Sequence, residues 1–448
     1  MIFVILILAL AIRIVNLDQS FWLDEATSII AARDYSVNEI LTKFSPGDFH
    51  PPLYYLLLKM WMGFLGSSEI AARSLSVLFG LGTIPFIYTL GKKLFSHKVG
   101  IFTALLLATA PLHIYYSQEA RMYVFETFLA TVVAYFFLRR NFVWLTLSSA
   151  ALLYTDYLPI FLLVSLFIYL LLYEKEYSAS AIRWVGGTAL LFFPWIPTLL
   201  AQFSIGTQVK QNAPLWFETL GRTNLKELAL VPVKFIIGRI SSYDKVFYGV
   251  TVAVAAIPFV ISFLNSIVRF SKTKLLWFWF LGPLILSAIF GALFSGFSYF
   301  RLLFILPAFY LLIAHGAFQL KNARLKKVVM ASLVLVNLVS AGIYLSNPRF
   351  HREDWRSAIS FIENNSKSNS AVVFVSKNQR DPYHYYARKV PSFGPEGADL
   401  NFSEIWLMRY VQNIFDPNDK LRATIESRGY TKIDEKDFNG VVVWRYVK

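Results

Sequence analysis

Long apolar runs separated by short polar segments occupy the first three quarters of the chain. Runs that approach 20 apolar residues can cross the hydrocarbon core of a bilayer as helices, because there every backbone polar group must be bonded within its own segment. The sequence predicts about eleven such helices, near residues 1–16, 69–91, 99–116, 122–138, 142–156, 158–173, 184–202, 246–266, 275–294, 298–317 and 327–346. The pattern therefore predicts an α-helical polytopic membrane protein, although the short runs around Tyr154–Pro159 can be divided differently.

Basic residues are concentrated in four of the short loops between these runs. Cytoplasmic loops of membrane proteins carry an excess of Lys and Arg. With a cytoplasmic N-terminus and eleven spans, all four loops are cytoplasmic: Lys92, Lys93 and Lys98; Arg139 and Arg140; Arg269, Lys272 and Lys274; Lys321, Arg324, Lys326 and Lys327. The first apolar run lacks the basic start and small-residue cleavage site of a signal peptide, so we interpret it as a retained span.

Two long polar segments are placed on the outer side by this topology. The first is the loop 17–68. The second is the tail 347–448, where β-prone runs (371–375, 440–446) alternate with helical patterns (354–364, 418–428). About 100 residues are enough for a small core. We therefore expect a transmembrane domain at 1–346 and an extracytoplasmic α/β domain at 347–448.

Composition narrows the class further. The chain is 56% hydrophobic and 16% charged, whereas about a quarter of the residues of soluble proteins are charged. The net charge of +15 does not indicate nucleic acid as a partner, because the basic residues cluster in loops that the topology rule explains. There is no cysteine, which excludes thiol catalysis and disulfides. The sequence contains no glycine-rich phosphate loop, HExxH motif or Gly-x-Ser-x-Gly elbow.

The first outer loop carries an acidic pair, Asp24 and Glu25, at the start of an expected helix, Leu23–Arg33. Acidic residues in a first helical turn complement the helix dipole, which is a purely structural explanation. An outward-facing Asp could instead act as a general base on an acceptor hydroxyl or help hold a divalent cation. The apolar positions Ala26, Ile29 and Ile30, with the stem of Arg33, would lie along the membrane surface.

Other polar residues fall on the same outer side. His50 precedes Pro51 and Pro52 and is either a residue at a helix start or a partner of Asp24 or a phosphate. Glu119 and Arg121 lie in a tight turn, 117–123. They are either interfacial anchors, with Arg121 snorkelling, or a phosphate-binding pair.

Asp156 and Arg301 have two interpretations each, and the segment 351–356 has one. Asp156 lies at the outer boundary or faces a wet cavity, because a carboxylate at the membrane centre costs about 2.5–3.5 kcal/mol. Arg301 either snorkels or neutralises a leaving phosphate. The segment 351–356 is explained by headgroup contact and by Asp354 as an N-cap, so no catalytic role is assigned to it.

These motifs, in this order, resemble the dolichyl-phosphate-mannose–protein mannosyltransferase superfamily over roughly residues 1–320, and most closely its prokaryotic polyprenyl-phosphate-sugar-dependent branch. The matching segments are Phe21-Trp22-Leu23-Asp24-Glu25, His50-Pro51-Pro52-Leu53-Tyr54-Tyr55, Ser117-Gln118-Glu119-Ala120-Arg121-Met122-Tyr123 and Tyr299-Phe300-Arg301 ahead of Pro307. The resemblance implies the GT-C membrane fold.

The resemblance also implies roles for individual residues. Asp24 matches the first-loop acidic residue, a catalytic base or metal-associated group, and Glu25 completes that motif, so both are expected to be catalytic. His50 stands where the related aminoarabinose transferases have Lys. Glu119 and Arg121 match the acidic–basic pair of the second outer turn. A divalent cation cofactor stays open, since metal dependence varies in the superfamily.

An outward-facing transferase needs a donor that travels in the membrane, since nucleotide sugars are made in the cytoplasm. We therefore expect a polyprenyl-phosphate-linked sugar donor and a protein, lipid or glycan acceptor, with inversion at the anomeric carbon. Asp24 is expected to remove or polarise the acceptor hydroxyl proton, and Arg121 or Arg301 to stabilise the departing phosphate. The alternatives are a transporter or lipid flippase, and a non-catalytic envelope scaffold.

Overall fold

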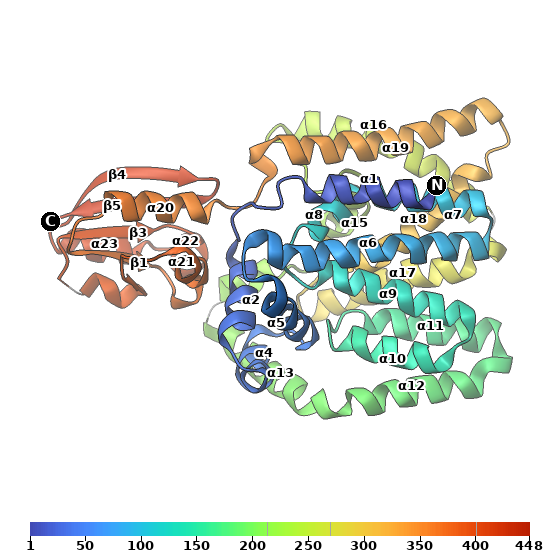
Figure 1. Ribbon diagram of the computed structural model, residues 1–448, viewed down its shortest axis with the longest axis horizontal. Helices are drawn as coiled ribbons and strands as arrows, with labels where there is room; N and C mark the ends of the chain where they lie inside the picture. Colours follow the sequence, from blue (N-terminus) through green and yellow to red (C-terminus); the bar gives the residue numbers. More distant parts are fainter. Residues whose placement is uncertain (213, 269, 400) are drawn as a thin grey trace.

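The computed structural model describes residues 1–212, 214–268, 270–399 and 401–448, so Arg269 of the third basic loop lies outside the described residues. A bundle of helices is joined to a small sheet domain at one end, and the N-terminus lies at the opposite end of the bundle (Figure 1). The bundle contains the helices α1 (Ile2–Ile14), α6 (Glu69–Leu94), α7 (His97–Thr109), α8 (Pro111–Ser117), α9 (Tyr123–Arg139), α10 (Phe142–Leu153), α11 (Ile160–Tyr173), η2 (Lys175–Tyr177), α12 (Ser178–Phe192), η3 (Phe193–Trp195), α13 (Ile196–Asn212), α14 (Pro214–Thr219), α15 (Leu225–Ile237), α16 (Lys245–Ile267), α17 (Phe270–Leu293), η4 (Tyr299–Ile305), α18 (Leu306–Phe318) and α19 (Ala323–Ser346).

The chain is a multi-pass membrane protein, as the hydropathy pattern predicts. Within the described ranges, six helices are long and apolar enough to cross a membrane: Glu69–Leu94, Lys175–Gln211, Lys245–Ile267, Phe270–Leu293, Tyr299–Phe318 and Ala323–Ser346. A bent pair, α7 with α8, makes a seventh if it is one span. The other apolar helices, such as α1, α10 and α11, have 10–17 residues. The number of strongly apolar spans is thus smaller than the eleven that the sequence predicts.

The expected span 99–116 is broken rather than continuous. Its two halves, α7 and α8, are bent by 59°, and Pro111 opens the second half. Proline has no N–H to continue the helical ladder. The carbonyls freed at the break are bonded by Arg13 of α1, whose guanidinium donates to Ala108 O (2.9 Å) and Leu107 O (3.4 Å). A buried Arg therefore satisfies backbone groups that the membrane cannot solvate.

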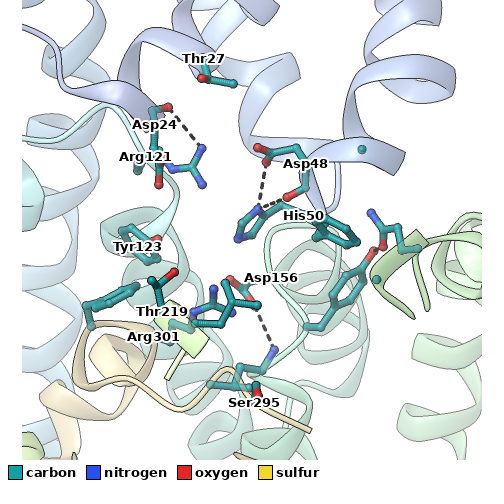
Figure 2. Close-up of a pocket in the computed structure, with 18 of the residues that line it drawn as sticks. Asp24, Thr27, Asp48, His50, Arg121, Tyr123, Asp156, Thr219, Ser295 and Arg301 are labelled. Carbon is teal, nitrogen blue, oxygen red and sulfur yellow. Dashed lines mark hydrogen bonds and ion pairs between the residues drawn. The ribbon is translucent and has the colours of Figure 1, made fainter. Parts of the chain in front are cut away.

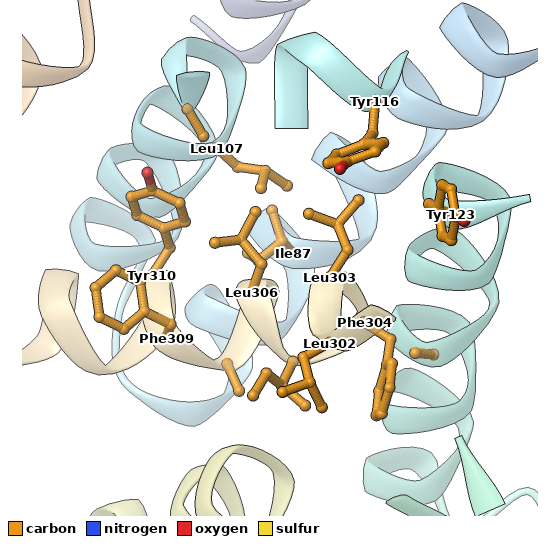
Figure 3. Close-up of a cluster of buried hydrophobic side chains, with 14 of the residues drawn as sticks. Ile87, Leu107, Tyr116, Tyr123, Leu302, Leu303, Phe304, Leu306, Phe309 and Tyr310 are labelled. Carbon is orange, nitrogen blue, oxygen red and sulfur yellow. The ribbon is translucent and has the colours of Figure 1, made fainter. Parts of the chain in front are cut away.

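Helix α18 lies at the centre of the bundle. Of the apolar window in η4 and α18, 89% is buried inside the protein, as expected for a helix that is hydrophobic on all sides. Figure 3 shows Leu302, Leu303, Leu306 and Phe309 of this segment packed with Ile87 and Leu107 and, at the edge of the cluster, with Tyr123. This core fixes the position of η4, which carries Arg301.

The segment 17–68, expected as an outer loop, is helical rather than open. It contains α2 (Leu23–Asp34), α3 (Val37–Glu39), η1 (Ile40–Phe44), α4 (Ser45–Asp48) and α5 (Leu53–Leu65). The helix expected at Leu23–Arg33 is confirmed as α2. Its expected contact with the membrane surface is wrong, because Ala26 and Ile29 are buried in the core of the protein.

The C-terminal sheet domain has the expected α/β character, with strands in the order β2-β1-β3-β5-β4. Its elements are η5 (Pro348–Phe350), α20 (Trp355–Asn365), β1 (Ser370–Phe374), η6 (Lys377–Gln379), α21 (Asp381–Tyr386), β2 (Ser392–Phe393), η7 (Pro395–Asp399), β3 (Glu404–Met408), α22 (Gln412–Phe415), α23 (Lys420–Ser427), β4 (Thr431–Phe438) and β5 (Val441–Val447). The expected N-cap is confirmed: Asp354 accepts from the Ser357 amide. Strands β1 and β3 are parallel and buried throughout, which requires cover on both faces.

The sheet domain docks on α2, the helix that carries Asp24 (Figure 1). Thr27 of α2 donates a hydrogen bond to Asp381 (2.7 Å), and the Phe21 amide donates to the Tyr386 hydroxyl (2.8 Å). The rings of Phe21 and Tyr385 meet edge to face at 5.1 Å. Helix α2 is therefore held between the sheet domain and the bundle, which fixes the direction of Asp24.

Candidate active site

A cavity of about 2080 Å³ lies where α2, one end of the bundle and the sheet domain meet. It is lined by six of the seven residues that sequence analysis singles out: Asp24, His50, Glu119, Arg121, Asp156 and Arg301. Glu25 is absent from the lining. The structure thus brings together residues from five separate segments of the chain.

Asp24 and Asp48 face the same part of the cavity, with Arg121 and His50 beside them (Figure 2). His50 does not cap the helix that follows; its Nδ1 lies 2.9 Å from Asp48 Oδ2, and the Tyr55 hydroxyl donates to the same oxygen. Arg121 donates to Ser28 Oγ (3.0 Å) and to the Asp24 carbonyl oxygen (3.4 Å). Its guanidinium is 3% exposed, so the snorkelling interpretation of Arg121 is wrong.

The two carboxyl groups are held in different electrostatic states. Burial raises the pKa of Asp24 above its usual value, although the positive charge of Arg121 opposes that effect. Burial would also raise the pKa of Asp48, but Arg121 and the hydrogen bonds from His50 and Tyr55 outweigh it and lower the pKa. When the pKa values of two carboxyl groups are shifted in opposite directions, the group with the raised pKa can act as a base and the group with the lowered pKa stays charged. Asp24 is therefore the stronger base.

Glu25 forms a buried ion pair rather than a cavity wall. Arg73 of α6 donates to both Glu25 oxygens, at 2.8 and 2.6 Å, and the Ala120 amide donates at 2.7 Å. Arg352 lies 3.6 Å from Glu25 and donates to Glu119 at 2.7 Å. This network ties α2, α6, the outer turn and the tail together, which indicates a positioning role for Glu25.

The same network corrects the interpretation of the segment 351–356. Arg352 does not contact headgroups, because its side chain is 6% exposed and its charge is matched by buried carboxylates. A buried charge without a partner is costly, so these residues pair inside the protein. Burial raises the pKa of Glu119. The positive charge of Arg352 opposes this effect, and the negative charge of Glu25 adds to it.

Arginines face the lower part of the cavity. Arg301 lies next to Asp156 (Figure 2), and its buried Nε has no hydrogen-bond partner among the residues that the structure describes. Arg239 lines the same cavity and donates to the Tyr115 hydroxyl at 2.8 Å. Asp156 follows α10, accepts from the Leu158 amide at 3.1 Å and lines the cavity, as its second interpretation predicts. Arginine donors of this kind suit a phosphate group.

The cavity also has an apolar wall. Leucine, valine and aromatic side chains from three helices line it: Leu163, Val164 and Phe167 of α11, Trp184 and Val185 of α12, and Phe290 and Leu293 of α17. Several of them are exposed in the protein, such as Val164 and Val185. A hydrocarbon chain can lie against them without burying a polar group.

Within the described ranges, no group of three or more His, Asp or Glu residues is placed to hold a metal ion. The described residues therefore do not fit a metal site made from protein ligands alone.

Sequence reasoning missed Asp48, Arg73 and Arg239. A signal was available for Asp48 alone, since it stands two residues before His50 in an outer segment. Arg73 and Arg239 are ordinary helix-end or loop cations in the sequence. Only the fold shows that one neutralises Glu25 and that the other enters the cavity.

Comparisons with known proteins agree with this geometry. Residues 49–200 match the family model described as dolichyl-phosphate-mannose-protein mannosyltransferase. An uncharacterized protein of Aquifex aeolicus (strain VF5) is 26% identical over 377 residues, which are 79% of this chain and 83% of that protein.

Solved structures share the fold of the entire chain. ArnT from Cupriavidus metallidurans in the apo state has a TM-score of 0.58 at 14% identity, over 99% of this chain and 97% of that one. The same enzyme bound to undecaprenyl phosphate has a TM-score of 0.56. The archaeal oligosaccharyltransferase AglB from Archaeoglobus fulgidus, in complex with an inhibitory peptide and a dolichol-phosphate, has a TM-score of 0.57 at 12% identity, over 99% and 74%. The expected resemblance is thus confirmed: residues 49–200 match the mannosyltransferase model, and the whole chain has the fold of the GT-C membrane enzymes.

Proposed function

We propose that this protein is a membrane glycosyltransferase that moves a sugar from a polyprenyl-phosphate donor to an acceptor hydroxyl on the extracytoplasmic face. The observation that carries the proposal is a single cavity that joins a carboxylate–arginine cluster to an apolar wall. A lipid-linked sugar phosphate has the same two parts, a charged head and a hydrocarbon tail. Structures of similar fold with undecaprenyl phosphate and dolichol-phosphate support this donor class.

The reaction is a single displacement with inversion. Asp24 accepts the proton of the acceptor hydroxyl while the oxygen of that hydroxyl forms a bond to the anomeric carbon. The bond from that carbon to the phosphate oxygen breaks, and the polyprenyl phosphate leaves with the electron pair. Arg301 and Arg121 donate to the phosphate as its charge grows. Asp48 holds His50 in place, because its carboxylate bonds to His50 Nδ1 and accepts from the Tyr55 hydroxyl.

Topology supports the donor class. The tail and the cavity lie at the end of the bundle opposite the N-terminus (Figure 1), and the basic loops predict a cytoplasmic N-terminus. A cavity on the outer face has no supply of nucleotide sugars, so its donor must diffuse in the membrane.

Substitution of Asp24 tests the proposal. Asp24→Asn removes the base and keeps the shape, so we expect transfer to fall by about 10²- to 10⁴-fold, measured as sugar transfer in membranes that contain the endogenous donor and acceptor. The matched control is Asp34→Asn on the same helix, an exposed partner of Arg33 that does not line the cavity. Full activity in Asp24→Asn, at normal membrane insertion, would remove Asp24 from the mechanism.

A transporter or lipid flippase is the second candidate, favoured by the size of the cavity and its apolar wall. The reaction product distinguishes this candidate from a glycosyltransferase. Reconstituted protein that moves a labelled polyprenyl phosphate across liposomes without any covalent transfer would support the flippase. Formation of a new glycosidic bond supports the transferase.

A further inference from the structure

The sheet domain meets the cavity with the carboxyl ends of its two central parallel strands. Strand β1 leads into η6 and strand β3 leads into residues 409–411, and both connections line the cavity. After β1 the chain turns towards β2, and after β3 it continues towards β4 and β5 on the other side. In open α/β sheets, ligands bind at the carboxyl ends of strands where neighbouring connections diverge in this way. This part of the cavity is distinct from the arginines and the apolar wall assigned to the donor.

Gln379, the last residue of η6, is the unexplained group at this edge. Its side chain is 1% exposed and it lines the cavity, yet neither Oε1 nor Nε2 has a hydrogen-bond partner among the described residues. A buried amide without partners destabilises a fold. In the same domain, Gln412 is also buried, but its Nε2 donates to the Asp416 carbonyl at 2.5 Å. The fold therefore provides a hydrogen-bond partner for the Gln412 amide, whereas the Gln379 amide is available to a ligand.

The surroundings of Gln379 are polar and carry both signs of charge, because Asp381 of the same turn also lines the cavity and accepts a hydrogen bond from Thr27. Lys377 on the same turn lies 3.4 Å from Glu396, which balances its charge. Trp22 lines the same cavity, and its indole N–H is likewise buried without a partner in the described part of the chain. The free groups are thus an amide, which both donates and accepts, and an aromatic ring with one donor. This chemistry fits neutral hydroxyl groups better than a phosphate or a carboxylate.

Building on the proposed transfer reaction, we propose that the turn 377–381 forms the acceptor subsite, that Gln379 is a specificity-determining residue, and that the acceptor is a glycan. Adjacent sugar hydroxyls offer one donor and one acceptor, which match the two ends of the Gln379 amide. A peptide bound by strand addition is favoured less, because that mode of recognition needs an open sheet edge. The edge strands of this sheet are β2 and β4, and neither lines the cavity.

The test uses the full-length protein in lipid nanodiscs and a deletion strain of its source organism. Envelope material from that strain supplies both donor and acceptor, and the product is identified by mass spectrometry. We expect the sugar to be attached to another sugar. We also expect Gln379→Met, which keeps the shape and removes the hydrogen bonds, to raise the KM for the purified acceptor about 10- to 100-fold. Binding of undecaprenyl phosphate, the donor-side probe, should be unchanged.

Gln412→Met is the matched control. It removes an amide that the fold uses, so we expect a lower melting temperature and an unchanged acceptor KM. Gln379→Met should keep or raise the melting temperature, which a structural role would not allow. An unchanged KM in Gln379→Met, or a product with the sugar on a polypeptide or a lipid phosphate, overturns the inference. Absence of any transfer by the wild-type protein would instead overturn the proposed function.

Discussion

At the scale of single residues, the site depends on the positive charge of Arg121, which acts on the two carboxyl groups of Asp24 and Asp48. Arg121 lowers the pKa of Asp24 and of Asp48, but only Asp48 also receives hydrogen bonds from His50 and Tyr55. Burial consequently dominates at Asp24 and raises its pKa. A base of raised pKa is closer to the working pH and accepts a proton more readily. Asp24 and Asp48 are the same residue type, but one is suited to be a base and the other stays charged because their neighbours differ.

This difference predicts a pH profile. Asp24 acts as a base only when deprotonated, so transfer should fall as the pH drops through its pKa, which lies above the ordinary value of about 3.9. Replacing Arg121 by Ala removes the charge that lowers this pKa, so the acid limb of kcat/KM should move to higher pH. Arg121→Lys keeps the charge and should leave the limb close to its original place. A profile that does not move in Arg121→Ala would show that Arg121 does not act on Asp24.

At the scale of elements, helix α2 is positioned by charges that it does not present to the substrate. Glu25 pairs with Arg73 of α6 inside the protein, and Arg352 joins the pair to the outer turn through Glu119. Thr27 on a neighbouring turn of α2 is bonded to Asp381 of the sheet domain. The direction of Asp24 is therefore set from both sides of its helix. Glu25, predicted from the motif to be catalytic, is proposed here to position Asp24.

A double-mutant cycle tests this role. Glu25→Gln or Arg73→Met alone leaves one buried charge without its partner, which should lower the free energy of unfolding by about 3–5 kcal/mol. The double variant should recover much of that loss and retain measurable transfer. The measurement is chemical unfolding in nanodiscs together with transfer activity. Glu39→Gln, in an exposed ion pair with Lys43, is the control and should not change unfolding. A folded but inactive double variant would return Glu25 to a catalytic role.

At the scale of the whole molecule, the cavity exists only where the three parts of the chain meet. Its arginines come from the bundle, its base from the outer helices and its proposed acceptor turn from the sheet domain. All of these lie at the end of the bundle away from the N-terminus (Figure 1). The proposed donor follows from the side of the membrane on which this end opens.

Cysteine labelling tests the orientation, and the chain contains no cysteine of its own. Asn38→Cys in the outer helical segment and Ser427→Cys in the sheet domain are at exposed positions. Both should react with a membrane-impermeant maleimide in intact cells. Lys321→Cys, in a basic loop, should react only after permeabilisation. The opposite pattern would place the cavity in the cytosol and remove the reason for a lipid-linked donor.

The sequence alone determined the features that depend on local pattern. Hydropathy and the periodicity of apolar residues predicted a helical membrane protein, helix α2, and the alternation of strands and helices in the tail. These features depend on each segment's own residues. The motifs also placed Asp24, His50, Arg121, Asp156 and Arg301 on one side, and the structure shows them lining one cavity.

The tertiary structure decided which charges meet and which helices bend. Glu25 is separated by 48 residues from Arg73, and Glu119 by 233 from Arg352, so no local pattern could show that these groups neutralise each other. The bend at Pro111 needed Arg13, from a different helix, to satisfy the freed carbonyls. The free amide of Gln379 is visible only once its surroundings are known. Burial and pairing are properties of contacts between distant segments, and those contacts exist only in the folded chain.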